Sequence, residues 1–167
     1  MNNIFFIGMM GSGKTTTAKE FAKLRGLKAV DLDQLIEEEA HQSINEIFEK
    51  HGESAFREFE KTVLKRVAGN RNQVVATGGG IVLLADNIEL MRSAGTVIYL
   101  KTAFSVLWDR VKHSKSRPLL KASSPQEVFR SLFDARTPLY EVTAHHSVVT
   151  DYKTPREVAN EINKILF

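Results

Sequence analysis

Short runs of apolar or β-branched residues recur five times along the chain, and amphipathic helical patterns separate them. The runs predict strands at residues 4–7, 28–31, 73–77, 96–100 and 147–150. Short, continuously apolar strands that alternate with helices are typical of a parallel sheet whose two faces are both covered. The pattern therefore predicts a three-layer, doubly wound α/β fold around a five-stranded parallel sheet.

Two helical stripes define the expected buried faces near the ends of the chain. After the first strand, Thr17, Phe21 and Leu24 recur at spacings of four and three residues, which places them on one side of a helix. Thr154 and Pro155 mark the start of the last helix. The buried face of that helix is expected to comprise Val158, Ile162, Ile165 and Leu166.

Residues 33–72, between the second and third strands, form a longer segment than one crossover helix requires. Ser43 followed by Glu46 predicts a capping box at a helix start, and Gly52 interrupts the helical pattern. We interpret the segment as a helical substrate-binding insertion. Its second helix is expected over residues 53–67, with a stripe of Phe56, Phe59 or Glu60, Val63, Leu64 and Val67.

Residues 112–124 contain Lys, Ser and Pro without an apolar period, which predicts a mobile loop long enough to act as a lid. The basic residues of this region, among them Arg110 and Arg117, have a single aromatic neighbour, Trp108, and offer no base-stacking platform. The formal net charge of +3 is also far below that of a nucleic-acid-binding surface. An anionic small molecule is the better-fitting partner.

The composition, with 43% hydrophobic and 26% charged residues in a chain of 167, suits one globular domain spanning residues 1–167. The absence of cysteine excludes disulfides and thiolate metal sites. The first residues lead directly into a strand without a basic leader, and no apolar stretch approaches the roughly 18 residues of a membrane span. We expect a cytoplasmic monomer without a membrane or nucleic-acid partner.

Residues 8–15 read Gly-Met-Met-Gly-Ser-Gly-Lys-Thr, which is the phosphate-binding pattern G-x-x-x-x-G-K-[ST]. The loop follows the first strand and opens a helix, so that its backbone N–H groups and the helix N-terminus can hold phosphates. An ordinary glycine-rich turn would not need this context. The pattern predicts that the chain binds a nucleoside triphosphate, and the variable positions Met9 and Met10 imply nothing special.

Asp31 and Asp33 stand at the carboxyl end of the second strand, the edge at which open α/β sheets bind ligands. Strand alternation would aim both carboxylates to the same side. One would hold Mg²⁺ through water while the other contacts the phosphoryl acceptor. The alternative is that Asp33 only caps a helix over residues 34–40.

Three further features have both a structural and a functional interpretation. Arg57 is either a surface cation paired with Glu60 or a bidentate ligand for a carboxylate. The triple glycine 78–80 is either a plain turn or a close approach of backbone to ligand, and its spacing is not that of an NAD site. Arg117, in Arg117-Pro118-Leu119-Leu120, belongs either to a solvated charge run or to a lid that stabilises the transferring phosphoryl group.

Two other features carry less information. Arg136, four residues before Tyr140, is compatible with a simple helix-surface cation. The pair His145-His146 has no third ligand at a metal-binding spacing and is interpreted as structural or solvent-facing.

Taken in order, these motifs cover nearly the whole chain, which resembles the shikimate kinases, a family of P-loop enzymes similar to nucleoside monophosphate kinases. The resemblance implies the P-loop NTPase fold and ATP-dependent phosphorylation of the 3-hydroxyl of shikimate, a step toward chorismate and the aromatic amino acids. The motifs that carry it are the phosphate loop, Asp31-Leu32-Asp33, Ser43-Ile44-Asn45-Glu46-Ile47-Phe48, Gly52-Glu53, Phe56-Arg57 with Glu60, Gly78-Gly79-Gly80, Arg117-Pro118-Leu119-Leu120, and Arg136 with Tyr140.

The resemblance also implies roles for individual residues. Catalysis would depend on Asp33, which orients or deprotonates the attacking hydroxyl, together with Lys14 and Arg117 at the phosphates. Mg²⁺ would be held by Thr15 and, through water, by Asp31. The expected ATP-binding residues are Gly11, Ser12, Gly13, Lys14, Thr15, Thr16, Arg110, Arg117 and Lys153. The expected shikimate-binding residues are Asp33, Phe48, Phe56, Arg57, Gly78, Gly79, Gly80, Pro118, Leu119 and Arg136.

Three positions depart from the family pattern. Ala18 replaces a glycine, Lys153 replaces an adenine-side arginine, and His145 replaces an acidic residue. The nearest alternative is another small-molecule kinase of the same group, similar to gluconate kinases, and Arg57 with Arg136 favours a carboxylate acceptor over an uncharged polyol. A non-catalytic nucleotide-binding module is the other alternative, and it would not need Asp33.

Overall fold

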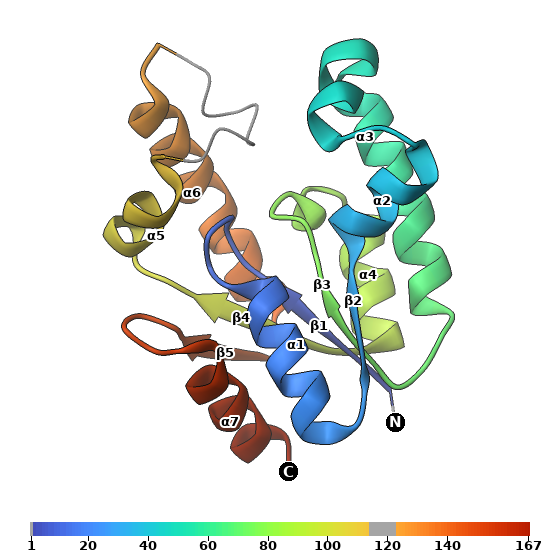
Figure 1. Cartoon of the computed structure of the whole chain (residues 1–167), viewed down its shortest axis with the longest axis vertical. Helices are drawn as coiled ribbons and strands as arrows, with labels where there is room; N and C mark the ends of the chain where they lie inside the picture. The colour runs from blue at the N-terminus through green and yellow to red at the C-terminus, as the bar shows by residue number, and fades with distance from the viewer. Residues whose placement is uncertain (1, 114–122) are drawn as a thin grey trace.

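The computed structural model describes residues 2–113 and 123–167, which form a five-stranded parallel sheet in the order β2-β3-β1-β4-β5 (Figure 1). The predicted fold class is confirmed. Each predicted strand differs from the observed one by no more than one residue at either end. The strands are β1 Asn3–Ile7, β2 Lys28–Asp31, β3 Gln73–Ala76, β4 Gly95–Lys101 and β5 His146–Val149.

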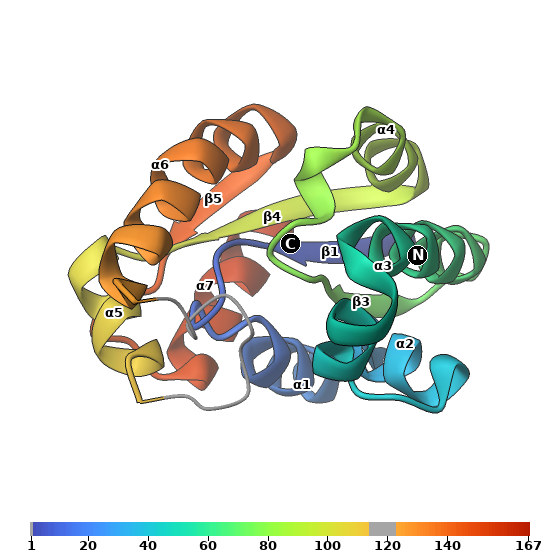
Figure 2. The same ribbon diagram turned by 90° about the horizontal axis from the view of Figure 1, so that it is seen from above.

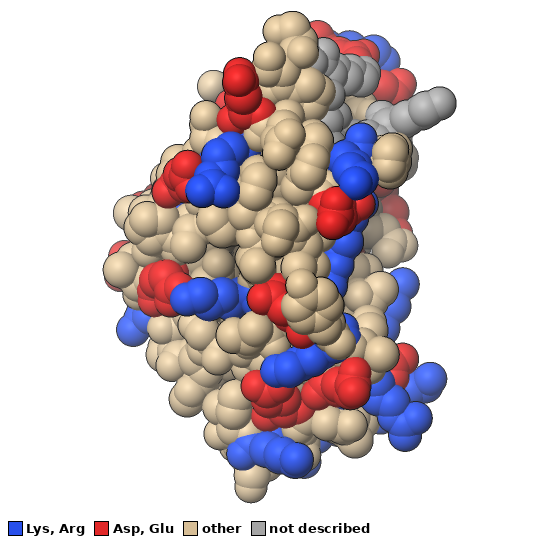
Figure 3. All heavy atoms as spheres, turned by 90° about the vertical axis from the view of Figure 1, so that its left-hand side faces the viewer, with Lys and Arg blue, Asp and Glu red and all other residues tan. Residues whose placement is uncertain are grey.

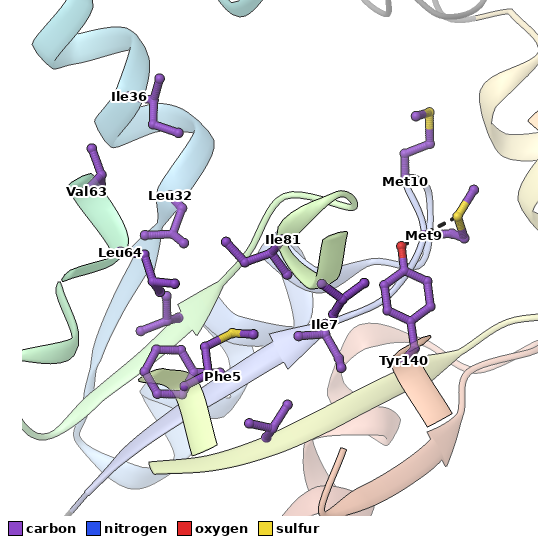
Figure 4. Packing of buried hydrophobic residues seen from close by; sticks show 14 of the residues in the cluster. Phe5, Ile7, Met9, Met10, Leu32, Ile36, Val63, Leu64, Ile81 and Tyr140 are labelled. Atoms are coloured by element: carbon purple, nitrogen blue, oxygen red, sulfur yellow. Dashed lines mark hydrogen bonds between the residues drawn. The ribbon is translucent and has the colours of Figure 1, made fainter. Parts of the chain in front are cut away.

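The side chains of β1 alternate between the two faces of the sheet, as a strand requires. Ile4 and Phe6 pack with α1 (Lys14–Arg25) and α7 (Pro155–Leu166). Phe5 and Ile7 belong to the larger cluster on the other face, shown in Figure 4, which is covered by the remaining helices. Figure 2 shows the resulting three layers from above, with α1 and α7 on one side and α4 and α6 on the other.

The remaining helices are α2 Leu32–Ala40, α3 Ile44–Ala68, the short 3-10 helix η1 Ile81–Leu83, α4 Ala85–Ala94, α5 Phe104–Val111 and α6 Pro125–Thr143. The predicted capping box is confirmed: Ser43 accepts from the Glu46 N–H and the Glu46 carboxylate accepts from the Ser43 N–H. Gly52 has φ 82° and ψ 173° inside α3, a conformation that favours glycine and bends the helix. Helices α2 and α3 therefore account for most of the segment at residues 33–72.

Two expected core residues are instead exposed. Leu24 is 49% exposed and Ile165 is 39% exposed, because each lies in the last turn of its helix, where few neighbours cover the stripe. Nearby, the Arg25 guanidinium stacks over the Phe167 ring at 3.8 Å. Of the predicted lid at residues 112–124, positions 114–122 lie outside the described residues. None of the helices in the described ranges could cross a lipid bilayer.

Candidate active site

The phosphate loop connects β1 to α1 at the carboxyl edge of the sheet, and hydrogen bonds to its own carbonyls define its shape. The Lys14 ammonium donates to the carbonyls of Gly8 at 2.8 Å and Met9 at 2.9 Å. Arg110 reaches from α5 and donates to the Gly11 carbonyl at 2.9 Å. Lys14 and Arg110 therefore both lie at the phosphate loop. This is where a residue that binds ATP phosphates and a residue beside the nucleotide are expected.

Three cavities lie in series along this edge. The first, of about 310 Å³, is lined by the phosphate loop together with Arg110 and Lys153. The second, of about 240 Å³, contains Lys14, Thr15 and Asp31 and shares residues of the loop with the first. The third, of about 320 Å³, is bounded by α2, α3 and α6, and it shares with the second cavity Met10, Asp33 and Gly79.

Asp31 and Asp33 both line the second cavity, but the reason differs from the predicted strand alternation. The strand ends at Asp31, which is the N-cap of α2 and accepts from the Gln34 N–H at 3.2 Å. Asp33 lies in the first turn of that helix, so the interpretation of Asp33 as the cap is wrong. The second oxygen of Asp31 accepts from the Thr15 hydroxyl at 2.5 Å, which pairs the two expected metal ligands.

The third cavity collects most of the residues that were expected to bind the acceptor. Its walls include Asp33, the triple glycine 78–80, Arg57 and Arg136. The rings of Phe48 and Phe56 pack with centroids 4.9 Å apart and form an apolar wall. Arg136 is 5% exposed and the Arg57 side chain 13% exposed, so neither is the surface cation that the sequence also allowed.

Arg57 is fixed by two acidic residues of α3. One guanidinium nitrogen donates to Glu60 at 2.7 Å and another to Glu53 at 3.2 Å. Glu60 is fully buried, and burial raises the pKa of its carboxyl while the Arg57 charge opposes the increase. If the guanidinium moved away, the buried Glu60 would lose its charged partner, which is costly. Glu60 therefore holds Arg57 in one orientation at the cavity wall.

Two residues of the triple glycine make room for neighbouring side chains, and the third accepts a hydrogen bond. A Cβ atom at Gly78 would lie 2.8 Å from a Glu60 carboxylate oxygen and 3.0 Å from one of Asp33. The Gly79 carbonyl accepts from the Tyr140 hydroxyl at 2.5 Å. A Cβ atom at Gly80 would lie 2.6 Å from Cζ of Arg57. These close approaches, rather than a turn alone, explain glycine at positions 78 and 80, whereas a Cβ atom at Gly79 would meet nothing closer than 3.4 Å.

The Tyr140 hydroxyl also contacts a residue of the phosphate loop. It lies 3.6 Å from the Met9 sulfur, and burial raises the pKa of this hydroxyl (Figure 4). Met10, which the sequence gave no role, is 7% exposed and lines both the second and the third cavity. The sequence could not indicate this role of Met10, because the phosphate-loop pattern leaves this position variable.

Other residues of the third cavity were not expected from the sequence as ligand-binding residues. They are Glu37, Ser43, Ile44, Asn45 and Glu60. Three of them, Ser43, Ile44 and Asn45, lie within the predicted capping box Ser43–Glu46, which in retrospect marked where α3 meets the cavity.

Two positions that depart from the family pattern have structural partners. Lys153 donates to Glu161 at 2.5 Å and to the Val149 carbonyl at 2.8 Å, while it also lines the first cavity. His145 accepts from the Val97 N–H at 2.9 Å, which agrees with its structural interpretation. Arg117, Pro118 and Leu119 lie outside the described residues.

Comparison with known proteins agrees with this geometry. A family model described as shikimate kinase matches residues 10–167. A shikimate kinase from Thermodesulfovibrio yellowstonii is 41% identical, over 98% of this chain and 94% of its own. A solved shikimate kinase from Acinetobacter baumannii, in complex with shikimate, superposes with a TM-score of 0.97 at 37% identity and covers 99% of this chain and 93% of its own. A gluconokinase from Sinorhizobium meliloti, at 19% identity and a TM-score of 0.65, shares the fold, with 96% of this chain and 88% of its own covered.

Proposed function

The chain belongs to the shikimate kinase family, and we propose here how its own residues carry out the transfer of a phosphoryl group from ATP to shikimate. The enzyme phosphorylates the 3-hydroxyl of shikimate and yields shikimate 3-phosphate and ADP, a step in aromatic amino acid biosynthesis. One observation carries the assignment of roles: the acceptor cavity with its two arginines shares Asp33 with the phosphate cavity.

ATP would lie along the first and second cavities. The N–H groups of Gly11, Ser12 and Gly13 and the start of α1, with Thr15 and Thr16, would bind its phosphates. Lys14 now donates to two carbonyls of the loop, and a phosphate oxygen would take one of those places. Arg110 and Lys153 line the first cavity, which supports a position for them beside the adenine.

Shikimate would occupy the third cavity. Its carboxylate matches the charge of Arg57 and Arg136, since a guanidinium can bind both oxygens of a carboxylate at once. The backbone of Gly78, Gly79 and Gly80 lines the same end of the cavity. The Phe48 and Phe56 rings would pack against the carbocycle, together with Pro118 and Leu119 from the proposed lid at residues 112–124.

Asp33 is proposed to orient the attacking 3-hydroxyl and accept its proton. It lines both cavities, so a hydroxyl bound to it would face the phosphates beside Lys14. Phosphoryl transfer needs such positioning and charge stabilisation more than covalent participation of the protein. Arg117 would add positive charge at the transferring group, and closure of the lid would exclude water as a competing acceptor.

The residues at the phosphate cavity also fit a magnesium ion. Mg²⁺ prefers oxygen ligands, keeps several waters, and takes only one or two protein ligands beside nucleotide phosphates. The Thr15 hydroxyl and the Asp31 carboxylate supply such oxygens, directly and through water. Bound there, the ion would neutralise phosphate charge. Among the described residues, no group of three or more His, Cys, Asp or Glu side chains is placed to hold a metal ion.

The enzyme is further proposed to act as a monomer in the cytoplasm, without a nucleic-acid partner. The charge distribution on one face supports the proposal that no nucleic acid is bound. On the face in Figure 3, basic and acidic side chains of the described residues are interspersed and form no large basic patch. Ion pairs such as Lys101–Glu141 at 2.6 Å neutralise individual surface charges.

A coupled assay of ADP formation with a panel of acceptors tests the proposed function. We expect Mg²⁺-dependent turnover with shikimate and none with gluconate or nucleoside monophosphates. Equal turnover on shikimate, gluconate and nucleoside monophosphates would contradict the proposal. It would favour another small-molecule kinase of the same fold. ATP binding without turnover on any acceptor would favour a non-catalytic module.

A further inference from the structure

Asn45 is a polar residue of the acceptor cavity that none of the roles above uses. It lies in the first turn of α3, lines the third cavity and is half-buried. Its side-chain oxygen is buried and has no hydrogen-bond partner among the residues that the structure describes. Buried polar atoms of native proteins nearly always have a partner, so an orphaned amide beside a ligand cavity calls for an explanation.

The polar neighbours of Asn45 in the cavity wall are already engaged within the protein. Glu37 accepts from the Ile44 N–H at 2.9 Å. Ser43 is committed to the capping box with Glu46, through bonds of 2.8 Å and 3.2 Å. The Asn45 amide is therefore a hydrogen-bonding group that remains available at the α3 side of this cavity.

The position of Asn45 also fits contact with a bound carbocycle. It precedes Phe48 by three residues, which places the two side chains on the same side of α3. Phe48 forms the apolar wall with Phe56. A ring packed against this wall would present the hydroxyls on its rim to the neighbouring amide.

The chemistry of the acceptor leaves one group without an assigned partner. Shikimate carries a carboxylate and three neighbouring ring hydroxyls, at carbons 3, 4 and 5. The two arginines account for the carboxylate, and the two oxygens of Asp33 suffice for the reacting 3-hydroxyl and its neighbour at carbon 4. The 5-hydroxyl remains, and a hydroxyl both donates and accepts hydrogen bonds, as an amide does.

We propose that Asn45 is a specificity-determining residue whose side-chain amide binds the 5-hydroxyl of shikimate. The terminal torsion of asparagine is soft, so rotation of the amide can present either its oxygen or its nitrogen to the ligand. This inference rests on the proposed function and adds a polar contact to it. It predicts that the enzyme recognises the acceptor at a third point besides the arginines and Asp33.

A cycle that changes the protein and the acceptor together tests the proposal. The wild type and Asn45→Ala are compared with shikimate and with 5-deoxyshikimate, by steady-state kinetics and by calorimetric titration of each acceptor. With shikimate, we expect kcat/KM to fall about three- to tenfold in Asn45→Ala, which is the range for one neutral hydrogen bond. With the deoxy acceptor, the two proteins should perform alike. The KM for ATP should not change.

Asn163→Ala is the matched control, because its side-chain oxygen is also buried and unpartnered but lies on α7, outside the cavity. It should behave as the wild type on both acceptors. Asn45→Ser supplies a second, smaller polar variant, and a melting curve of each protein shows whether it folds. The kinetic constants of the Asn45 variants are compared with those of the wild type once the wild type has been shown to phosphorylate shikimate.

Two outcomes would overturn the proposal. One is an equal loss on both acceptors, which would make Asn45 structural, and the other is no loss on either. If the wild type itself failed to phosphorylate shikimate, the proposed function would fail instead.

Discussion

The guanidinium of Arg57 lies against the backbone of Gly80, and the absence of a side chain at residue 80 makes this contact possible. A Cβ atom there would lie 2.6 Å from the Arg57 Cζ atom. On its other side the guanidinium is held by Glu60 at 2.7 Å and Glu53 at 3.2 Å. The glycine and the two carboxylates together determine where the positive charge meets the acceptor cavity.

Gly80→Ala is therefore expected to weaken acceptor binding, with some loss of stability because the buried Glu60 loses part of its contact with Arg57. The added methyl group would displace Arg57, since the guanidinium is the movable end of a long side chain. We expect KM for shikimate to rise about tenfold or more, in line with the loss of a charged hydrogen bond, while KM for ATP changes little. Arg57→Ala sets the upper limit of the effect, measured by calorimetric titration of each ligand.

Gly69→Ala is the control for this prediction. Gly69 has a helical φ of −69°, and a Cβ atom there would meet nothing closer than 3.4 Å. It should leave both KM values unchanged. Equal weakening of shikimate and ATP binding by Gly80→Ala would contradict the assigned role of Arg57.

Asp33→Asn tests the proposed base. The change is nearly isosteric and lies outside the N-cap position, which Asp31 occupies, so helix α2 should remain intact. We expect kcat to fall about 10²- to 10⁴-fold, the usual contribution of a positioned base, with the affinity for ATP preserved. Asp134→Asn, on the surface of α6, serves as the control. An unchanged kcat would remove Asp33 from the chemistry.

The sequence predicted well those features whose signals are local. The phosphate loop, the strand before it and the helix after it are contiguous, so one short pattern determines all three. Asp31-Leu32-Asp33 offers two aspartates, two residues apart, that could each cap the helix, and the strand could end before either. The alternative that Asp33 is the cap therefore proved wrong, since Asp31 is the N-cap, while both carboxylates line the same cavity.

Features that depend on tertiary contacts were less accessible. Periodicity left Phe59 and Glu60 as alternatives for one buried position, and the structure buries the charged residue because Arg57 neutralises it. Arg136 of α6 and Arg57 of α3 line the same cavity, and no local pattern encodes this juxtaposition. Only the resemblance to a known family placed them together. Asn45 belonged to one of the motifs of that resemblance, but neither the pattern nor the resemblance gave it a role.

Tyr152 is expected to limit stability. It has φ +57°, the left-handed region that non-glycine residues seldom adopt, and its side chain is 93% exposed. Asparagine tolerates this conformation, so Tyr152→Asn should stabilise the protein by about 0.5–1 kcal/mol. For a chain of this size the melting temperature would rise by about 1–4 °C. Tyr152→Ala, which keeps the backbone penalty, should not reproduce the gain.

His145 connects the end of α6 to β4 through two hydrogen bonds with Val97. Its ring nitrogen Nδ1 accepts from the Val97 N–H at 2.9 Å, and the backbone N–H of His145 donates to the Val97 carbonyl at 2.8 Å. Partial burial lowers the pKa of His145, and the charges of Arg92 and His146 act in the same direction. Protonation of Nδ1 would abolish its capacity to accept, so the folded protein favours the neutral ring.

The unfolded chain therefore binds a proton at His145 more readily than the folded protein does. The stabilisation is complete above the unfolded pKa of about 6.5 and is lost as the pH falls below it toward the lower folded pKa. In His145→Asn the side-chain oxygen can accept the same bond but does not titrate. We expect its melting temperature to match the wild type at pH 8 and to exceed it at pH 5.5, after correction by the control His51→Asn, which replaces an exposed histidine on α3. A constant difference between the two proteins across this range would show that His145 does not titrate with folding.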